Sequence, residues 1–272
     1  MNVKVPIRPG SELAAEFWEK GRSESCPIYN MHAHMGQFHS MYVPRCEAAD
    51  MVRSMDAAGV KLACFAHGAA LHCPDISNRL TVEAVRAFPD RFRGYLTVNP
   101  HYPEVAEREL SQYDKLPDVY IGLKFHPDSH KVRLSDERYT AALEFADEHG
   151  LLLLSHTYDG SGFNGGDEVR RVLDKYEDMR FLMGHSLKSN WHEAAAIARD
   201  HPNAYLELTG VLGQWGAVDT LCEEAGSERM LFGTDLPWYG QHQGVGHLLS
   251  ADITDEDIHN ICHRNAEKLL GL

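Results

Sequence analysis

Short apolar segments alternate with amphipathic segments from residue 27 to the end of the chain, and this alternation constrains the fold more than any other feature. The apolar segments read as short buried strands, whereas the amphipathic segments have the spacing of helices. We predict strands at residues 27–32, 61–66, 92–98, 119–125, 151–154, 180–183, 204–208 and 230–232. We predict helices at residues 47–58, 78–88, 103–113, 136–149, 167–176, 191–199, 217–225 and 254–270.

Eight strand–helix units in 272 residues match the size and rhythm of a (β/α)8 barrel. Glycines 59 and 150 stand just past predicted helices, where glycine commonly ends a helix. A doubly wound sheet would place a glycine-rich phosphate loop after its first strand, but His-Ala-His-Met-Gly stands there. We therefore predict an α/β protein with a single-domain TIM barrel over residues 26–272 and a short N-terminal extension over residues 1–25.

The net charge and the hydropathy of the chain limit the classes of partner that it can bind. The net charge of -14 argues against nucleic acid or an anionic membrane as a partner. No stretch approaches membrane-spanning length, and the six cysteines include no CxxC pair. We expect a cytoplasmic protein with reduced thiols that acts on a small-molecule substrate and can form a homo-oligomer.

His32 and His34 lie at the end of the first predicted strand. Side chains alternate between the two faces of a strand, so histidines separated by one residue point the same way. Two adjacent imidazoles form half of a first-row metal site. A His-x-His pair alone is often exposed on the surface without a functional role, so its interpretation depends on the rest of the chain.

Polar residues recur at the ends of later strands. The carboxyl ends of the strands of a TIM barrel open onto one face, where active sites lie. The residues that end or follow these strands are Lys124, His126, His156, His185 and Asp235. Core packing does not require histidine or aspartate there, so we expect these side chains to meet at the barrel mouth.

Other polar and aromatic residues in the loops at that mouth are candidates to line the pocket. They are His67, His72, Asn99, Glu207, Tyr158, Trp238 and Tyr239.

The chain resembles the amidohydrolase superfamily, in its metal-dependent TIM-barrel hydrolase branch (the amidohydrolase 2 group), over residues 27–271. The motifs that carry the resemblance are His32-Ala33-His34, Gly122-Leu123-Lys124-Phe125-His126-Pro127, Ser155-His156-Thr157, Gly184-His185, Phe232-Gly233-Thr234-Asp235 and Asn265-Ala266. The resemblance implies that His32, His34, His156 and Asp235 bind a divalent metal, often zinc.

The resemblance leaves the number of metals open between one and two. In binuclear members a carboxylated lysine at Lys124 would bridge two metals, and His185 would bind the second. In mononuclear, decarboxylase-like members His185 would be catalytic, and Lys124 would be an ion-paired or substrate-binding residue. We expect the binuclear form, with Lys124 and His185 as ligands beside the other four residues.

The implied activity is hydrolysis, because a divalent metal lowers the pKa of bound water towards neutrality. We expect a metal-activated hydroxide to attack an amide, ester or lactone bond of a small substrate, which can be anionic. Asp235 would accept and return the proton, and His185, where free, would polarise the electrophilic oxygen. The alternative is a mononuclear zinc-dependent decarboxylase or lyase that acts on an aromatic or unsaturated carboxylic acid. A scaffold without turnover is disfavoured by the presence of the proton-shuttling Asp235, and the sequence does not identify the substrate.

Overall fold

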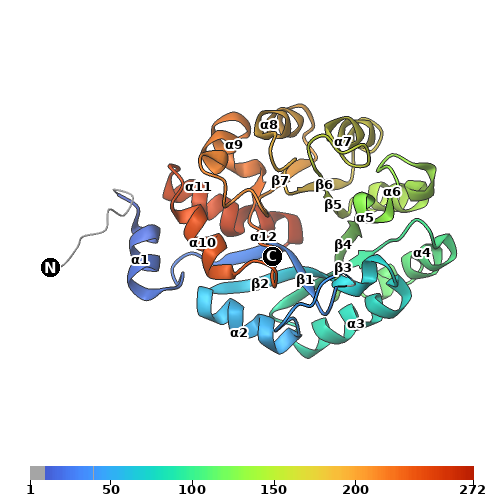
Figure 1. Cartoon of the computed structure of the whole chain (residues 1–272), viewed down its shortest axis with the longest axis horizontal. Helices are drawn as coiled ribbons and strands as arrows, with labels where there is room; N and C mark the ends of the chain where they lie inside the picture. The colour runs from blue at the N-terminus through green and yellow to red at the C-terminus, as the bar shows by residue number, and fades with distance from the viewer. Residues whose placement is uncertain (1–9, 39) are drawn as a thin grey trace.

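The computed structural model describes residues 10–38 and 40–272, and its eight strands form one parallel sheet in sequence order (Figure 1). The strands are β1 (Ile28–Met35), β2 (Val60–His67), β3 (Phe92–Thr97), β4 (Tyr120–Phe125), β5 (Leu152–His156), β6 (Arg180–Gly184), β7 (Ala204–Glu207) and β8 (Met230–Leu231). Helices alternate with these strands and surround them, which confirms the predicted (β/α)8 TIM barrel.

The α-helices are α1 (Glu12–Lys20), α2 (Ala48–Ala58), α3 (Pro74–Ala87), α4 (Pro103–Leu110), α5 (Pro127–His130), α6 (Thr140–Glu148), α7 (Gly166–Leu173), α8 (Trp191–Asp200), α9 (Ala217–Ala225), α10 (Gln241–Leu249), α11 (Asp255–His259) and α12 (Asn265–Leu270). Shorter helical turns are η1 (Gly68–Leu71), η2 (Tyr113–Lys115), η3 (Glu137–Tyr139), η4 (Ser227–Arg229) and the π-helical η5 (Asn260–Arg264). Among the described residues, no helix is both long and apolar enough to cross a lipid bilayer.

The segment predicted as an N-terminal extension contains the helix α1, and residues 1–9 lie outside the described residues. Helix α1 lies outside the ring of barrel helices, beside α10 and α11 (Figure 1). The Ser11 hydroxyl donates to Asp255 at 2.6 Å, and the Glu12 N–H donates to the same carboxylate. The division of the chain at residue 26 stays a prediction.

The barrel closes between β1 and the short segment that includes β8 and the residues after it. The Met31 N–H donates to the Phe232 carbonyl at 2.8 Å, and the His34 N–H donates to the Leu236 carbonyl at 2.7 Å. Since β8 itself has only two residues, these irregular bonds replace a regular ladder. The closing seam therefore runs directly beside the His-x-His pair.

A small apolar cluster is separate from the main core between sheet and helices. Its buried members are Met31, Leu62, Cys64, Ala66, Tyr95, Leu152, Leu154, Leu182, Leu231, Ala266 and Leu269. Most of these residues alternate along their strands, as side chains that share one face of a strand do, so we assign them to the barrel interior. The Tyr95 hydroxyl in this cluster donates to the Met31 carbonyl at 2.9 Å. The interior is thus a packed base beneath the barrel mouth.

The helices depart from the predicted pattern in several places, since α1 and the one-turn α5 were not predicted either. The single helix predicted over residues 254–270 is interrupted by the π-helical turn η5. Helix α10 was not predicted, because its two glycines and sparse charges give no amphipathic signal. One of them, Gly244, allows close packing, since a Cβ there would lie 2.7 Å from the Thr234 side chain.

Asn265 in the last helix provides a test of how that helix is fixed to the barrel. Its buried side-chain amide donates to the carbonyls of Ser227 at 2.8 Å and Met230 at 2.7 Å. Asn265→Ala is expected to lower the free energy of unfolding by about 1–3 kcal/mol, because two backbone acceptors lose their donor. Urea unfolding measures the change, with the exposed Gln112→Ala as a control expected to stay within about 0.5 kcal/mol. Equal effects of the two substitutions would show that Asn265 does not fix the helix.

Candidate metal centre

Four buried side chains converge at the barrel mouth. One ligand atom each of His32, His34, His156 and Asp235 lies within 4.8 Å of the others. The Asp235 Oδ1 atom lies 3.2 Å from His32 Nε2 and 3.4 Å from His34 Nε2. The structure thus brings together the four residues that the sequence predicts as ligands of one metal.

The donor atoms of this group fit a divalent cation. Among the described residues, the buried atoms without a hydrogen-bond partner include His34 Nε2, His156 Nε2 and Asp235 Oδ1. An unsatisfied buried polar atom costs about 1–3 kcal/mol, so three that face one point indicate a ligand. Three imidazole nitrogens and a carboxylate oxygen suit zinc and other first-row divalent ions.

Glu207, at the end of β7, orients His32. The Glu207 Oε2 atom lies 2.7 Å from His32 Nδ1, and both side chains are fully buried. A proton on Nδ1 leaves the Nε2 lone pair free for a metal, which is the usual arrangement of a carboxylate behind a ligating histidine. The Thr209 N–H donates to the other Glu207 oxygen at 2.7 Å. Sequence reasoning ranked Glu207 only among the lesser mouth residues, because a strand sequence does not reveal which side chain it faces.

Burial and nearby charges shift the protonation of this group. Burial raises the pKa of Glu207 to about 7, although the charge of His185 and the hydrogen bond from Thr209 oppose the increase. Burial would also raise the pKa of Asp235, but its interactions with the His32, His185 and His34 imidazoles outweigh burial and hold the pKa of this carboxyl well below its usual range. Burial lowers the pKa of His32, so its imidazole stays neutral and able to bind a cation.

The backbone at two of the site residues is left-handed. Asp235 has φ 56° and follows β8 by four residues, and its N–H donates to the His32 carbonyl at 3.0 Å. His185 has φ 70°, and Ser186, Leu187 and Lys188 have φ 44°, 54° and 52°. Residues other than glycine adopt this conformation at a cost, and such strain concentrates at functional sites. The turn after β6 therefore serves to place His185.

His185 keeps one ring nitrogen free. Its Nδ1 lies 3.1 Å from the Thr209 carbonyl, an acceptor, so Nδ1 carries the proton. Its buried Nε2 has no hydrogen-bond partner among the described residues and lies 4.0 Å from Asp235 Oδ2. His185 can thus accept a proton at Nε2 or bind a second metal there.

Lys124, on β4, lies inside the same cluster. Its Nζ atom is 2.7 Å from His32 Nε2, and the side chain is fully buried. Burial lowers the pKa of Lys124 to about 7, although the charges of Asp235 and Glu207 oppose the decrease. An ammonium group cannot bind a metal, but its deprotonated or carboxylated form can.

Aromatic rings surround the ligands. Trp238 stacks on His34 with ring centroids 4.5 Å apart, and Tyr158 stacks on His185 at 5.0 Å. The Tyr158 hydroxyl also lies 3.2 Å from His156 Nδ1, which leaves the Nε2 of that histidine for a metal. These two predicted pocket residues line the site.

Several predicted residues pack around the site instead of reaching its centre. The His126 ring packs at a tilt against the His156 ring, with centroids 3.8 Å apart, and His126 Nδ1 accepts from the Ser129 N–H. Asn99 donates to the Leu71 carbonyl and shapes a loop. Tyr239 is exposed.

Asn30 was missed by the sequence reasoning. Its amide donates to Thr234 Oγ1 at 2.7 Å, and its Oδ1 accepts from the His32 N–H at 3.1 Å. Asn30 thus bonds the start of the His-x-His segment to the segment that carries Asp235. A lone polar residue in an apolar strand, two positions before His32, was the available signal.

Comparisons with known proteins identify the family of the chain and agree with its barrel fold. The family described as amidohydrolase matches residues 29–272, whereas no curated protein matches the chain. An uncharacterised TIM-barrel protein from Bordetella bronchiseptica is similar in structure (18% identity, TM-score 0.76, 90% of this chain and 98% of that chain). The 2,6-dihydroxybenzoate decarboxylase from Rhizobium is also similar in structure, with 14% sequence identity and a TM-score of 0.73. The match covers 91% of this chain and 99% of that chain. A third similar structure is 5-carboxyvanillate decarboxylase from Novosphingobium aromaticivorans, solved with manganese and 4-hydroxy-3-methoxy-5-nitrobenzoic acid. It has 17% sequence identity and a TM-score of 0.72, and the match covers 93% of this chain and 97% of that chain.

Substitution of Glu207 tests its orienting role. Glu207→Gln is expected to weaken metal binding by about 10–100-fold, because His32 loses its carboxylate partner. Titration with Mn²⁺ followed by electron paramagnetic resonance measures the affinity, with the exposed Glu223→Gln as the matched control. An affinity equal to that of the control would contradict an orienting role for Glu207.

Proposed function

The chain belongs to the amidohydrolase family, and from that premise we propose that it is a metal-dependent lyase that removes CO2 from an aromatic carboxylic acid. The observation that carries this proposal is the free Nε2 of His185 beside a single four-ligand group. Two similar structures are decarboxylases of hydroxylated benzoic acids, which favours this reaction over hydrolysis.

Decarboxylation requires a proton at the carbon that loses CO2. The carbon–carboxylate bond breaks, its electron pair stays on the ring carbon, and a proton takes the place of the carboxylate. We assign the movement of this proton to His185 and Asp235, whose Nε2 and Oδ2 atoms lie 4.0 Å apart. The Thr209 carbonyl fixes the His185 tautomer, so Nε2 can accept a proton and then donate it.

The residues that would hold the cation are His32, His34, His156 and Asp235. When bound, the cation supplies positive charge that attracts the oxygen atoms of an anionic substrate and stabilises negative charge. This donor set accepts both zinc and manganese, so the choice of metal is a matter for measurement.

The aromatic side chains at the mouth suit a flat substrate. Trp238 and Tyr158 each lie against a ring of the metal site, and Phe38 packs edge-on against Trp238 at 5.2 Å. Flat rings favour offset-stacked or edge-to-face contacts with one another. A planar benzoic acid can therefore make such contacts while its polar groups face the ligand cluster.

Hydrolysis remains the second candidate because of Lys124. Its Nζ lies 2.7 Å from His32 Nε2, where a carboxylated lysine could bridge two metals. His185 Nε2 would then serve as a ligand of the second metal. The two reactions thus differ in the state of Lys124 and in the metal count of this site.

The activity itself tests the proposal. Protein loaded with Mn²⁺ or Zn²⁺ is expected to release CO2 from 2,6-dihydroxybenzoate or a related hydroxybenzoate, as measured by trapped CO2 and chromatography of the phenol. His185→Asn and Asp235→Asn should each slow turnover by at least ~10²–10⁴-fold, because each removes a proton-transfer group. The exposed His192→Ala should leave the rate unchanged. Cleavage of lactones or amides without release of CO2 would favour the hydrolase.

Lys124→Ala separates the two candidates independently of the substrate. For the lyase, this variant should keep one Mn²⁺ and bind it more tightly, because it lacks the positive charge beside His32. For the binuclear hydrolase, it should lose one of two Mn²⁺ ions, and added acetate or propionate should restore the second. Mn²⁺ titration distinguishes these results, with the exposed Lys61→Ala as the control.

A further inference from the structure

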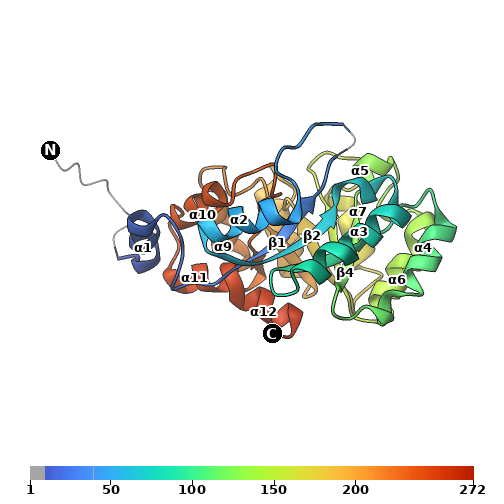
Figure 2. The same cartoon turned by 90° about the horizontal axis from the view of Figure 1, so that it is seen from below.

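A second group of ligand-type side chains lies far from the barrel mouth. One ligand atom each of Cys26, His259 and His263 lies within 4.8 Å of the others. Cys26 stands two residues before β1 begins, whereas both histidines belong to the C-terminal helical segment. Helices α11 and α12 lie on the side of the molecule away from the loop that follows β1 (Figure 2). The group therefore occupies the end of the barrel opposite the candidate metal centre.

The two histidines are fixed with their nitrogens face to face. The π-helical turn η5 starts directly after His259 and contains His263, and the His259 Nδ1 and His263 Nε2 atoms lie 3.0 Å apart. The capping box at Thr254 fixes the start of this helical segment, so the pair is held by a rigid element. Two imidazole nitrogens at this separation either share one proton or bind one cation.

Glu267 lies behind His263 as Glu207 lies behind His32. The Glu267 Oε2 atom is 3.0 Å from His263 Nδ1, one helical turn away. Within the part of the chain that the structure describes, that buried Nδ1 makes no aligned hydrogen bond, so a small adjustment would give it a carboxylate acceptor. A carboxylate behind a histidine commonly orients the other ring nitrogen towards a metal.

The sulfur atom gives this group a different chemistry from that of the first site. Cys26 is buried, and its thiol contacts that of Cys262, which raises the pKa of Cys262 well above its ordinary value. Cysteine and histidine together form the ligand set of structural zinc sites.

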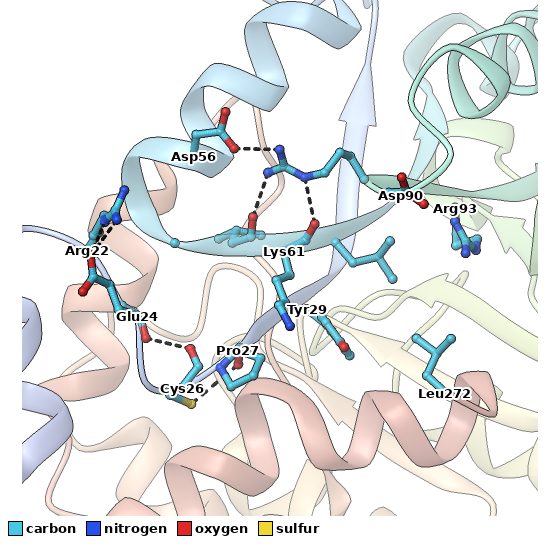
Figure 3. Close-up of a pocket in the computed structure, with 15 residues that line it drawn as sticks. Arg22, Glu24, Cys26, Pro27, Tyr29, Asp56, Lys61, Asp90, Arg93 and Leu272 are labelled. Atoms are coloured by element: carbon cyan, nitrogen blue, oxygen red, sulfur yellow. Dashed lines mark hydrogen bonds and ion pairs between the residues drawn. The ribbon is translucent and has the colours of Figure 1, made fainter.

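His259 and His263 are half-buried, so a cation can reach this group from solvent past their side chains. Cys26 lines an open cavity of about 1010 Å³ at the start of β1 and β2, next to Pro27 and Tyr29 (Figure 3). Arg22 on the rim of this cavity is paired with Glu24, and Arg91 is paired with Asp56. These ion pairs neutralise two of the four basic side chains that line the cavity; the other two are Lys61 and Arg93.

We propose that Cys26, His259 and His263 form a second metal site, which binds a zinc-type divalent cation and fastens the start of β1 to the C-terminal helices. The role is structural, because the barrel end opposite the mouth contributes to stability instead of catalysis. The bound cation links residues separated by more than two hundred positions and lies near the strands where the barrel closes.

Cobalt absorption tests the proposal without any reference to activity. Of the two ligand groups found among the described residues, this one alone has a sulfur ligand, so protein loaded with Co²⁺ should show a near-ultraviolet sulfur-to-cobalt band. His32→Ala should keep the band, whereas Cys26→Ser should abolish it. Cys73→Ser, which alters an exposed thiol, is the matched control and should keep it. His263→Ala should abolish the band as well, and it is the second variant if Cys26→Ser fails to fold.

Thermal unfolding gives an independent measurement. In the His32→Ala background, added Zn²⁺ should raise the melting temperature, because binding to the folded state alone stabilises it. Adding Cys26→Ser to that background should remove the increase. Wild-type protein that holds Co²⁺ without a sulfur band, or a band unchanged by Cys26→Ser, would overturn the proposal. A failure of the proposed lyase activity would leave both measurements unaffected.

Discussion

The closure of the barrel between β1 and the segment after β8 is the constraint on which the functional geometry depends. Seven of the strand-to-strand contacts are parallel ladders, whereas this last one consists of a few backbone hydrogen bonds and a single bridge. One of these bonds joins the Asp235 N–H to the carbonyl of His32. The same step that closes the barrel therefore also assembles the ligand group. Asn30 strengthens this connection through its bonds to Thr234 and to the backbone of His32.

The site also buries several ionisable groups close to one another. Glu207, Asp235 and Lys124 are all buried, together with the imidazoles of the site. An isolated buried charge is costly, so each of these groups needs a partner of opposite charge or a hydrogen bond. Glu207 contacts His32 and the Thr209 N–H, whereas among the described residues Asp235 Oδ1 has no hydrogen-bond partner. The negative charge of Asp235 is thus not fully compensated at the point where the proposed cation would lie.

Much of the fold could be predicted from the sequence because barrel strands are short, apolar and evenly spaced. The same regularity places Lys124, His156 and His185 at one end of the sheet, as the structure confirms. Pairing between side chains of distant strands was not predictable, because it depends on the angle between strands and on local backbone. The contact of Glu207 with His32 is one example.

The remaining departures also have physical causes. Helix α10 is specified by close packing of Gly244 against Thr234, not by an amphipathic repeat. The π-helical turn η5 inserts into a segment whose sequence has ordinary helical spacing, so the pattern predicts one continuous helix. The number of metals depends on the chemical state of Lys124, which no sequence encodes.

The left-handed turn at His185–Lys188 affects how the protein loses activity when it is heated. None of its four residues is glycine, and each costs about 1–2 kcal/mol in this conformation. Bonds from neighbouring strands hold the turn, including that from the Leu187 N–H to Thr157 and that from the Ser186 hydroxyl to the Glu207 carbonyl. If those strands loosen, the turn relaxes before the barrel unfolds. The temperature of inactivation would then lie below the temperature of melting, with His185 displaced in an otherwise native protein.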